Sequence, residues 1–353
     1  MEFGTQFNTH ITNYSVSDFV AMSRRAYDRG FQTMWLNDNA RYRNVFIVLA
    51  AVAAKVPIKL GTATIVPYFH QPLDLAAKLA TLSELCEGRE LSIGIAVGDL
   101  GQTQAFVEFT RRLSMLRETA VFLKRTLAGE TVGFQDFPNL TNTFHLNPTG
   151  KFKLAFPSAG PLTLYGGSLG PKSLALAGEY MDGVVFPGQF LACLRTGRLK
   201  RMLEQAHEAA AREATSKTLR VAALVNVSIL RDRAKARQFA LPQVAHSIVS
   251  LKVLNFSKKE FEQLGIDPDR VDRLEKMFAA GATIEEAAHL VDDKMISAYY
   301  LAGTPEDVAP AAISLAKELQ AYGINELVFS KMGPDYAESL DLLASEVLPY
   351  LQN

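Results

Sequence analysis

The sequence has few of the features that mark secreted, membrane-spanning or nucleic-acid-binding proteins. It contains two cysteines in 353 residues, Cys86 and Cys193, so we expect no disulfide framework but two reduced thiols in a cytoplasmic protein. The longest apolar run, residues 45–56, is shorter than the ~20 residues that span a bilayer. The N-terminus lacks the basic and apolar pattern of a signal peptide. Lysine and arginine (37) balance aspartate and glutamate (37), so no overall field attracts nucleic acid or a membrane surface.

Several catalytic motifs are also missing. The chain has no GxSxG elbow, no Walker loop and no GxGxxG after the first predicted strand, which argues against hydrolases, NTPases and Rossmann proteins. The six histidines are scattered and form no HxxxH pair, so we expect no metal site. What the chain does have is 48% hydrophobic residues, enough for a large buried core.

Short β-rich runs alternate with runs of helical period along most of the chain. Strands are predicted at residues 2–7, 32–36, 58–66, 91–97, 162–165, 183–186, 220–230 and 326–330. Helices are predicted at residues 17–29, 45–54, 73–86, 103–127, 171–180, 190–214, 305–322 and 334–351. Eight strand-then-helix units predict an α/β fold of the (β/α)8 or TIM-barrel type.

Two segments interrupt the alternation. Residues 129–161 are rich in Gly, Pro, Asn and Phe, and we expect an insertion with a short hairpin near Thr143–Leu154. Residues 232–300 are mostly helical in pattern with mixed charge, and we expect them to form an excursion of one βα loop. The chain has no visible repeat or linker, so residues 1–353 are predicted to form one domain with these two insertions.

Three blocks of sequence, in order, resemble one known superfamily. They are residues 26–60 (AYDRGFQTMWLNDNARYRNVFIVLAAVAAKVPIKL), 61–99 (GTATIVPYFHQPLDLAAKLATLSELCEGRELSIGIAVGD) and 164–183 (LYGGSLGPKSLALAGEYMDG). They resemble the luciferase-like monooxygenases and the coenzyme F420-dependent reductases, and NDNARYRNVF at 37–46 is most similar to the methylenetetrahydromethanopterin reductase branch. The resemblance implies a small-molecule substrate, FMN or the deazaflavin coenzyme F420, and a homodimer. Helices 45–54 and 73–85, apolar almost all round, are the predicted dimer face.

Two glycine-containing segments are candidates for binding the cofactor. Residues 61–64 (GTAT) are either plain core strand or, as the resemblance implies, a bulge beneath the flavin-type ring with a cis bond between Ala63 and Thr64. Residues 166–172 (GGSLGPK) are either a plain turn or a phosphate cradle, because glycines let amides approach an anion at a helix N-terminus. Lys172 is predicted to lie outside the contact shell of the phosphate.

The resemblance also brings departures from the family pattern. Asn39 stands where many members have histidine, and Gln6 stands where the methanopterin reductases have glutamate; neither side chain transfers protons near neutral pH. His70 is the candidate substitute for the missing histidine. Asp99 either binds substrate or caps a helix, and Trp35 is either a cofactor contact or a core residue.

The predicted active site lies at the C-terminal ends of the strands. The predicted catalytic residues are Asn39, Asp99 and His70. The predicted cofactor-binding residues are Gln6, Trp35, Thr62, Ala63, Thr64, Gly98, Gly166, Gly167, Ser168 and Gly170. Three functions fit: hydride transfer with coenzyme F420, an FMN-dependent monooxygenase that uses reduced flavin and dioxygen, or a cofactor-binding barrel that has lost catalysis.

Overall fold

A computed structural model describes residues 1–9, 11–98, 103, 105–108, 110–167, 169–212 and 218–351 of the chain. Its contacts divide the chain into two compact units. Unit 1 contains residues 1–5, 186–204 and 222–353, and unit 2 contains residues 6–185 and 205–221. Within the described residues no helix is long and apolar enough to cross a membrane. The single-domain organisation stays a prediction.

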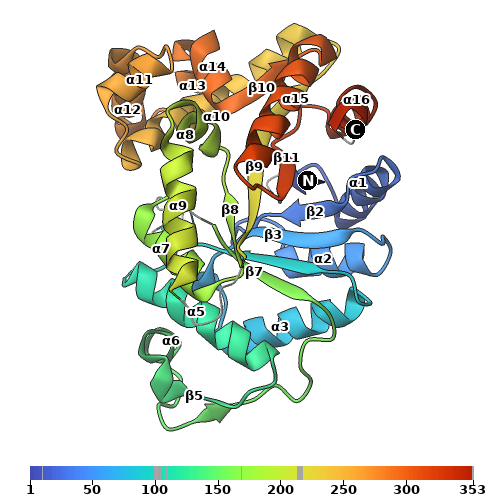
Figure 1. The fold of residues 1–353 in the computed structure, drawn as a ribbon, viewed down its shortest axis with the longest axis vertical. Helices are drawn as coiled ribbons and strands as arrows, with labels where there is room; N and C mark the ends of the chain where they lie inside the picture. The colour runs from blue at the N-terminus through green and yellow to red at the C-terminus, as the bar shows by residue number, and fades with distance from the viewer. Residues whose placement is uncertain are drawn as a thin grey trace. The chain divides into compact units, whose positions relative to one another are not determined.

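Unit 2 is built on parallel strands that neighbour one another in chain order (Figure 1). They are β2 (Thr33–Leu36), β3 (Lys59–Ile65), β4 (Leu91–Ile95), β7 (Leu162–Gly167) and the start of β8 (Gly183–Phe186). The helices that connect them are α1 (Val16–Asp28), α2 (Val45–Ala53), α3 (Pro72–Leu85), α5 (Arg112–Leu127) and α7 (Pro171–Tyr180). These elements match the sequence predictions except that α5 begins at Arg112. The residue before it, Arg111, has a φ of 48°, in the left-handed region, which separates α5 from the preceding segment.

Large aromatic side chains fill the space between the strands of unit 2. The indole of Trp35 on β2 and the ring of Tyr165 on β7 meet edge to face, with centroids 5.6 Å apart. A Cβ at Gly61 on β3 would lie 2.5 Å from the Trp35 ring, so only glycine leaves room for the indole. Trp35 has no exposed surface. It is therefore part of the core, and its predicted contact with a cofactor stays a prediction.

Residues 129–161, the first predicted insertion, contain a short antiparallel strand pair that differs from the expected hairpin. Strand β5 (Val132–Gly133) pairs antiparallel with β6 (Lys151–Phe152), and helix α6 (Pro138–Thr143) lies between them in the chain. A hairpin was expected near Thr143–Leu154, and only its second strand, β6, lies there. Its first strand, β5, lies earlier in the chain, so that part of the prediction was wrong. The physical reason is the N-terminus of α6: the buried Glu118 carboxylate accepts from the amides of Asn139 (2.8 Å) and Leu140 (3.0 Å) and stabilises a helix there.

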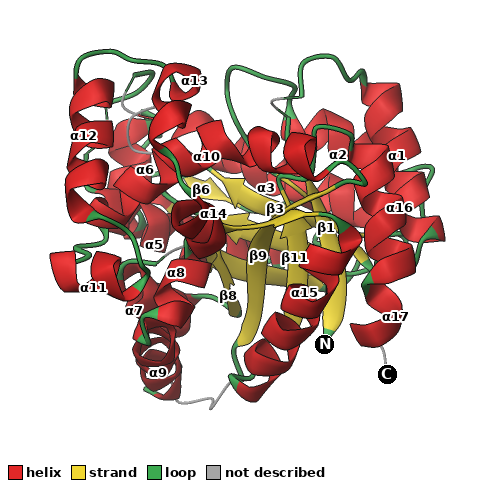
Figure 2. Cartoon of the chain, turned by 90° about the horizontal axis from the view of Figure 1, so that it is seen from above, coloured by secondary structure: helices red, strands yellow, loops and turns green. Residues whose placement is uncertain are grey.

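Unit 1 carries four parallel strands. Residues 2–5 of β1 (Glu2–Phe7) pair with β11 (Glu326–Ser330), β11 pairs with β9 (Arg220–Ile229), and β9 pairs with β10 (Tyr300–Gly303). Figure 2 shows β9 and β11 side by side, with helix α15 (Pro305–Ala321) outside them. Strand β10 was not predicted; it directly follows the segment up to residue 300 that was expected to be helical.

The helices of unit 1 confirm the helical character of residues 232–300. They are α10 (Arg233–Val253), α11 (Lys258–Gln263), α12 (Pro268–Ala279), α13 (Ile284–Ala287) and α14 (Asp293–Tyr299). The predicted helix at 190–214 is instead two helices, α8 (Phe190–Arg195) and, continuing into unit 2, α9 (Arg198–Ala211), because Gly197 between them has a φ of 74°. The last predicted helix likewise divides into α16 (Tyr336–Glu346) and α17 (Leu348–Leu351).

Candidate active site

The end of β3 has an irregular backbone. The register between β3 and β4 shifts between Thr62 and Ile65, and the peptide bond Ala63–Thr64 is cis, as the resemblance implied. The hydroxyl of Thr62, fully buried, donates to the carbonyl of Gly94 on β4 over 3.1 Å. The side-chain amide of Gln6 donates to the carbonyl of Ala63 over 3.0 Å. Thr62 and Gln6 therefore hold this backbone in place, while Ala63 and Thr64 are partly exposed.

Small side chains surround Thr64. A Cβ at Gly94 would lie 2.3 Å from the carbonyl oxygen of Thr62. A Cβ at Gly167, at the end of β7, would lie 2.5 Å from Thr64 Cγ2 and 3.2 Å from Ala96 Cβ. The strand ends thus leave no room for larger side chains. Ala63, Thr64, Ala96 and Gly167 form what we call the small-residue surface.

The two glycines that end β7 face opposite ways. A Cβ at Gly166 would lie 2.5 Å from Ala177 Cβ and 3.0 Å from Met181 Sδ, so this glycine serves the packing of α7 against β7. Gly166 is buried, and its predicted place in the cofactor site stays a prediction. Gly170 is the N-cap residue of α7 and is partly exposed.

Two other predicted residues belong to the segment after β4. Gly98 has a φ of 82° and is partly exposed. A Cβ there would meet Thr103 Oγ1 at 2.6 Å and Val66 Cγ2 at 2.9 Å, so both the backbone angle and the space require glycine. Asp99 and Ser168 lie outside the described residues, and their predicted roles stay predictions. Within the described residues no group of three or more His, Cys, Asp or Glu side chains is placed to hold a metal ion.

His70 forms a buried pair that the sequence did not reveal. Its Nε2 atom lies 2.8 Å from Asp38 Oδ2, and each side chain is 6% exposed. The same carboxylate oxygen accepts from the amide of Val66 over 3.2 Å, and the ring of Phe46 lies edge-on to the imidazole at 5.3 Å. A carboxylate on one ring nitrogen fixes the orientation of the imidazole. The predicted catalytic histidine is thus a buried, oriented side chain, and Asp38 is the partner that was missed.

The loop after β2 carries Asn39. Its side chain is partly exposed, and its Oδ1 atom accepts from the amide of Arg41 over 3.0 Å. The guanidinium of Arg43 donates to the carbonyls of Ile11 and Thr12, over 3.1 Å each. Arg43 therefore fixes the loop that follows β1, while Arg41 is exposed.

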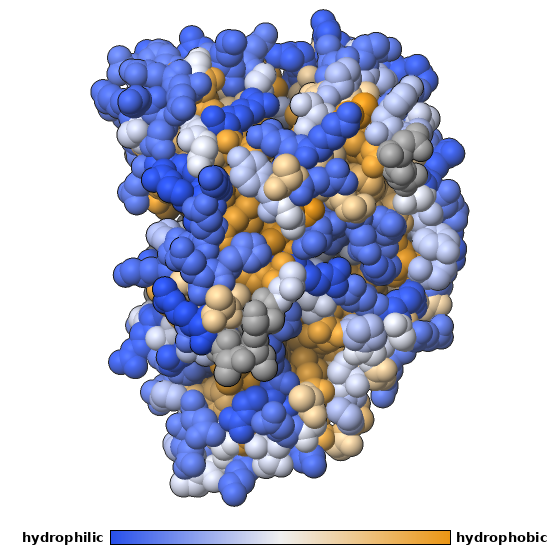
Figure 3. Space-filling view, viewed as in Figure 1, coloured by the Kyte–Doolittle hydropathy of each residue, from blue (hydrophilic) through white to orange (hydrophobic). Residues whose placement is uncertain are grey.

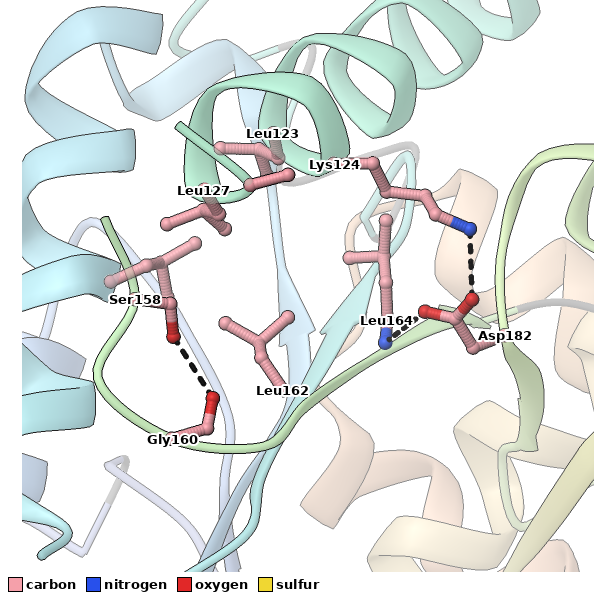
Figure 4. Close-up of a pocket in the computed structure, with 10 residues that line it drawn as sticks. Leu123, Lys124, Leu127, Ser158, Gly160, Leu162, Leu164 and Asp182 are labelled. Carbon is pink, nitrogen blue, oxygen red and sulfur yellow. Dashed lines mark hydrogen bonds and ion pairs between the residues drawn. The ribbon is translucent and has the colours of Figure 1, made fainter. Parts of the chain in front are cut away.

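A separate cavity of about 300 Å³ lies at the start of β7, near the end of α5 (Figure 4). Leucine side chains, among them Leu127 and Leu162, form its walls, and Lys124 Nζ pairs with Asp182 Oδ1 at 2.8 Å. Figure 3 shows an apolar hollow on this face, where α3 and the start of β7 lie in Figure 1. TIM-barrel active sites lie at the C-terminal ends of the strands, so this cavity is not the candidate site.

The strand order and the likeness to solved structures establish an α/β TIM barrel of eight parallel strands, with β10 as an additional strand beside β9. The coenzyme F420-dependent tetrahydromethanopterin reductase from Methanopyrus kandleri matches with a TM-score of 0.76 at 23% identity, over 99% of both chains. A type II Baeyer–Villiger monooxygenase, the oxygenating constituent of 3,6-diketocamphane monooxygenase from Pseudomonas putida in complex with FMN, matches with a TM-score of 0.64 at 20% identity, over 99% of this chain and 98% of that one.

Sequence comparison gives the family. The profile of the luciferase-like monooxygenases matches residues 1–321, so this chain belongs to that family. A curated relative, the 5,10-methylenetetrahydromethanopterin reductase of Archaeoglobus fulgidus, is 28% identical over 358 residues, which cover 100% of both chains. The family resemblance of the three sequence blocks is thereby confirmed.

Proposed function

We propose that this protein is an oxidoreductase that uses the deazaflavin coenzyme F420 to transfer hydride to or from a small organic substrate. The reductases that it matches along nearly the whole chain are named for reduction of a methylene-pterin or for their dependence on F420. The observation that carries the proposal is the small-residue surface. A flat ring needs a surface without protruding side chains, and Cβ atoms at Gly94 or Gly167 would remove it.

The residues of this surface have distinct tasks in the proposal. When bound, the deazaflavin supplies or accepts the hydride. Thr62 and Gln6 hold the backbone of Ala63 and Thr64, against which the ring lies. The amides from Gly167 to Gly170 lead into the N-terminus of α7, whose positive end favours the phosphate of the cofactor.

Asn39 and Gln6, which stand where relatives have ionisable side chains, do not transfer protons near neutral pH. Both side chains donate and accept hydrogen bonds. Gln6 is in addition engaged with the carbonyl of Ala63. Asn39 is partly exposed, so we assign it to hydrogen bonding with the substrate.

The second candidate is an FMN-dependent monooxygenase, which is favoured by the match to a monooxygenase solved with FMN. Equilibrium binding separates the two. We expect fluorescence titration of the purified protein to give saturable binding of oxidised F420 at least about 10-fold tighter than of FMN, a difference of ~1.4 kcal/mol. Tighter binding of FMN, together with oxygen consumption on addition of reduced flavin, would favour the monooxygenase. Binding of neither cofactor would favour a barrel that has lost catalysis.

We also propose that the protein forms a homodimer through helices α2 and α3. A groove of about 470 Å³ runs between them, lined in part by Phe46, Ile47, Leu82 and Leu85. Ile47 is 64% exposed and lines this groove, so a partner that covered the groove would also cover this side chain.

A cytoplasmic location is part of the same proposal. Cys86 and Cys193 are both buried and unpaired, and burial raises the pKa of the Cys193 thiol to about 12. Unreactive reduced thiols of this kind are typical of proteins in a reducing compartment.

A further inference from the structure

Asp38 contacts the backbone that ends β3 at two points. The amide of Asp38 donates to the carbonyl of Thr64 over 3.4 Å. Its carboxylate oxygen Oδ2 accepts from the amide of Val66 over 3.2 Å. All three residues belong to unit 2. Asp38 therefore holds the chain at Thr64 and just beyond it, in the part of β3 against which the ring is proposed to lie.

His70 in turn holds the carboxylate of Asp38. Its Nε2 atom lies 2.8 Å from the same Oδ2 atom that accepts from Val66, and the side chains of both residues are 6% exposed. A carboxylate only accepts hydrogen bonds, so Nε2 carries a hydrogen of the imidazole and donates it. Loss of this donor would leave the buried carboxylate of Asp38 with an unsatisfied oxygen, which is costly away from water.

The imidazole of His70 is itself fixed in place. The ring of Phe46 on α2 lies edge-on to it, with centroids 5.3 Å apart. The backbone amide of His70 donates to the carbonyl of Pro67 over 3.2 Å and closes the 3₁₀ turn η1 (Pro67–Phe69), which begins directly after Val66. A side chain that is packed and hydrogen-bonded in this way keeps its partner within a narrow range of positions.

The same contacts anchor the loop that follows β2. Asn37, directly before Asp38, accepts at Oδ1 from the amide of the buried Thr9 over 2.8 Å. Asn39, directly after Asp38, is the residue assigned above to the substrate. The loop is thereby tied to the segment after β1 and to the end of β3, and the position of Asp38 also determines where Asn39 lies.

We propose that His70 is a positioning residue of the cofactor site, which orients the carboxylate of Asp38 so that Asp38 fixes the backbone of Thr64 and Val66. The inference rests on the proposed function. It assigns to His70 a task that requires a hydrogen-bond donor in place of Nε2 and no transfer of a proton. Glutamine donates a hydrogen bond from its side-chain amide but does not titrate, whereas leucine donates none. His70→Gln and His70→Leu therefore separate the two tasks.

The first test detects the pair without a cofactor. An imidazole N–H that donates to a carboxylate away from water gives a proton NMR signal at unusually low field. We expect one such signal from the parent protein labelled with ¹⁵N-histidine, its loss in His70→Gln and its shift to higher field in Asp38→Asn. The matched control is His246→Leu, which should keep the signal, because the ring of His246 also meets a phenylalanine, Phe278, edge to face. A parent without the signal, or a signal unchanged in Asp38→Asn, would overturn the pair.

The second test measures binding of oxidised F420 by fluorescence titration, with urea unfolding to show that each variant is folded. A displacement of ~1 Å in a positioned site can cost about 10²-fold in function. We expect His70→Leu to weaken binding by at least about 10-fold, and His70→Gln to restore it to within about 3-fold of the parent. His246→Leu should bind as the parent does. Equal affinity of the parent and His70→Leu, or no restoration by glutamine, would overturn the positioning role.

Turnover of the enzyme loaded with deazaflavin distinguishes positioning from proton transfer. Loss of a general acid typically lowers turnover about 10²-fold or more, and neither glutamine nor leucine could replace one. We expect His70→Gln to recover the kcat that His70→Leu loses, and an equal loss in both variants would overturn the proposal. A parent that binds no deazaflavin would overturn the proposed function and this role with it, whereas a parent that binds it no better than His70→Leu would overturn the role alone.

Discussion

Replacing Gly167 by alanine tests whether the small-residue surface binds the cofactor. The new Cβ would lie 2.5 Å from Thr64 Cγ2, whereas carbon atoms pack at about 3.5–4.0 Å, so the Thr64 methyl must move by roughly 1 Å. Overpacking of this kind costs about 1–3 kcal/mol of stability. A displacement of ~1 Å in a positioned site can cost about 10²-fold in function. We expect Gly167→Ala to weaken deazaflavin binding by at least about 10-fold, as measured by fluorescence titration.

The neighbouring glycine provides a matched control. A Cβ at Gly166 would also meet its nearest atom at 2.5 Å, but that atom is Ala177 Cβ on α7. Gly166→Ala should therefore lose similar stability in urea unfolding and keep its affinity for the cofactor. If the two folded variants bound deazaflavin equally well, the surface around Thr64 would not be the ring site.

Three further predictions concern stability and assembly. The hydrogen bond from Arg198, with a smaller contribution from Ser257, lowers the pKa of Glu260 from 4.5 to about 2, so the stabilisation is complete above pH 4.5 and is lost as the pH falls toward 2. Arg198→Met should flatten the fall of Tm across that interval in calorimetry, and an unchanged slope would argue against it. Glu118→Gln should lower the free energy of unfolding by about 1.5–3 kcal/mol in urea, because the buried carboxylate accepts several hydrogen bonds; a change within about 0.5 kcal/mol would contradict this. Ile47→Lys should convert a dimer to a monomer in light scattering, whereas Val253→Lys, at a side chain 67% exposed, should not; a monomeric parent would refute the dimer.

The alternation of strands and helices could be predicted from the sequence because each strand is a compact run of β-forming residues followed by an amphipathic or apolar helix. Boundaries at β1, β7 and β11 agree with the structure to within about two residues. Strand β10 was missed because residues 300–303 directly follow a long segment of helical pattern. The break between α8 and α9 was missed because Gly197 acts through its backbone angle, which a hydrophobic pattern does not encode.

The candidate site was only partly predictable. The irregular backbone at Ala63 and Thr64 was implied by the family resemblance and is present. Trp35 was left open between the core and the cofactor site because an aromatic residue near a strand end does not reveal which side of the strand it faces. The pairing of Asp38 with His70 joins residues 32 positions apart, and no local pattern indicates such a contact.

Hydride transfer itself tests the central claim most directly. The purified protein, supplied with reduced F420 and a panel of carbonyl, imine and methylene-pterin substrates, can be followed by the absorbance of the oxidised deazaflavin. We expect one class of substrate to be reduced in equal amount to the F420 oxidised, at a rate that is unchanged when oxygen is removed. Failure of the whole panel to oxidise reduced F420, together with oxygen-dependent turnover of reduced FMN, would contradict it.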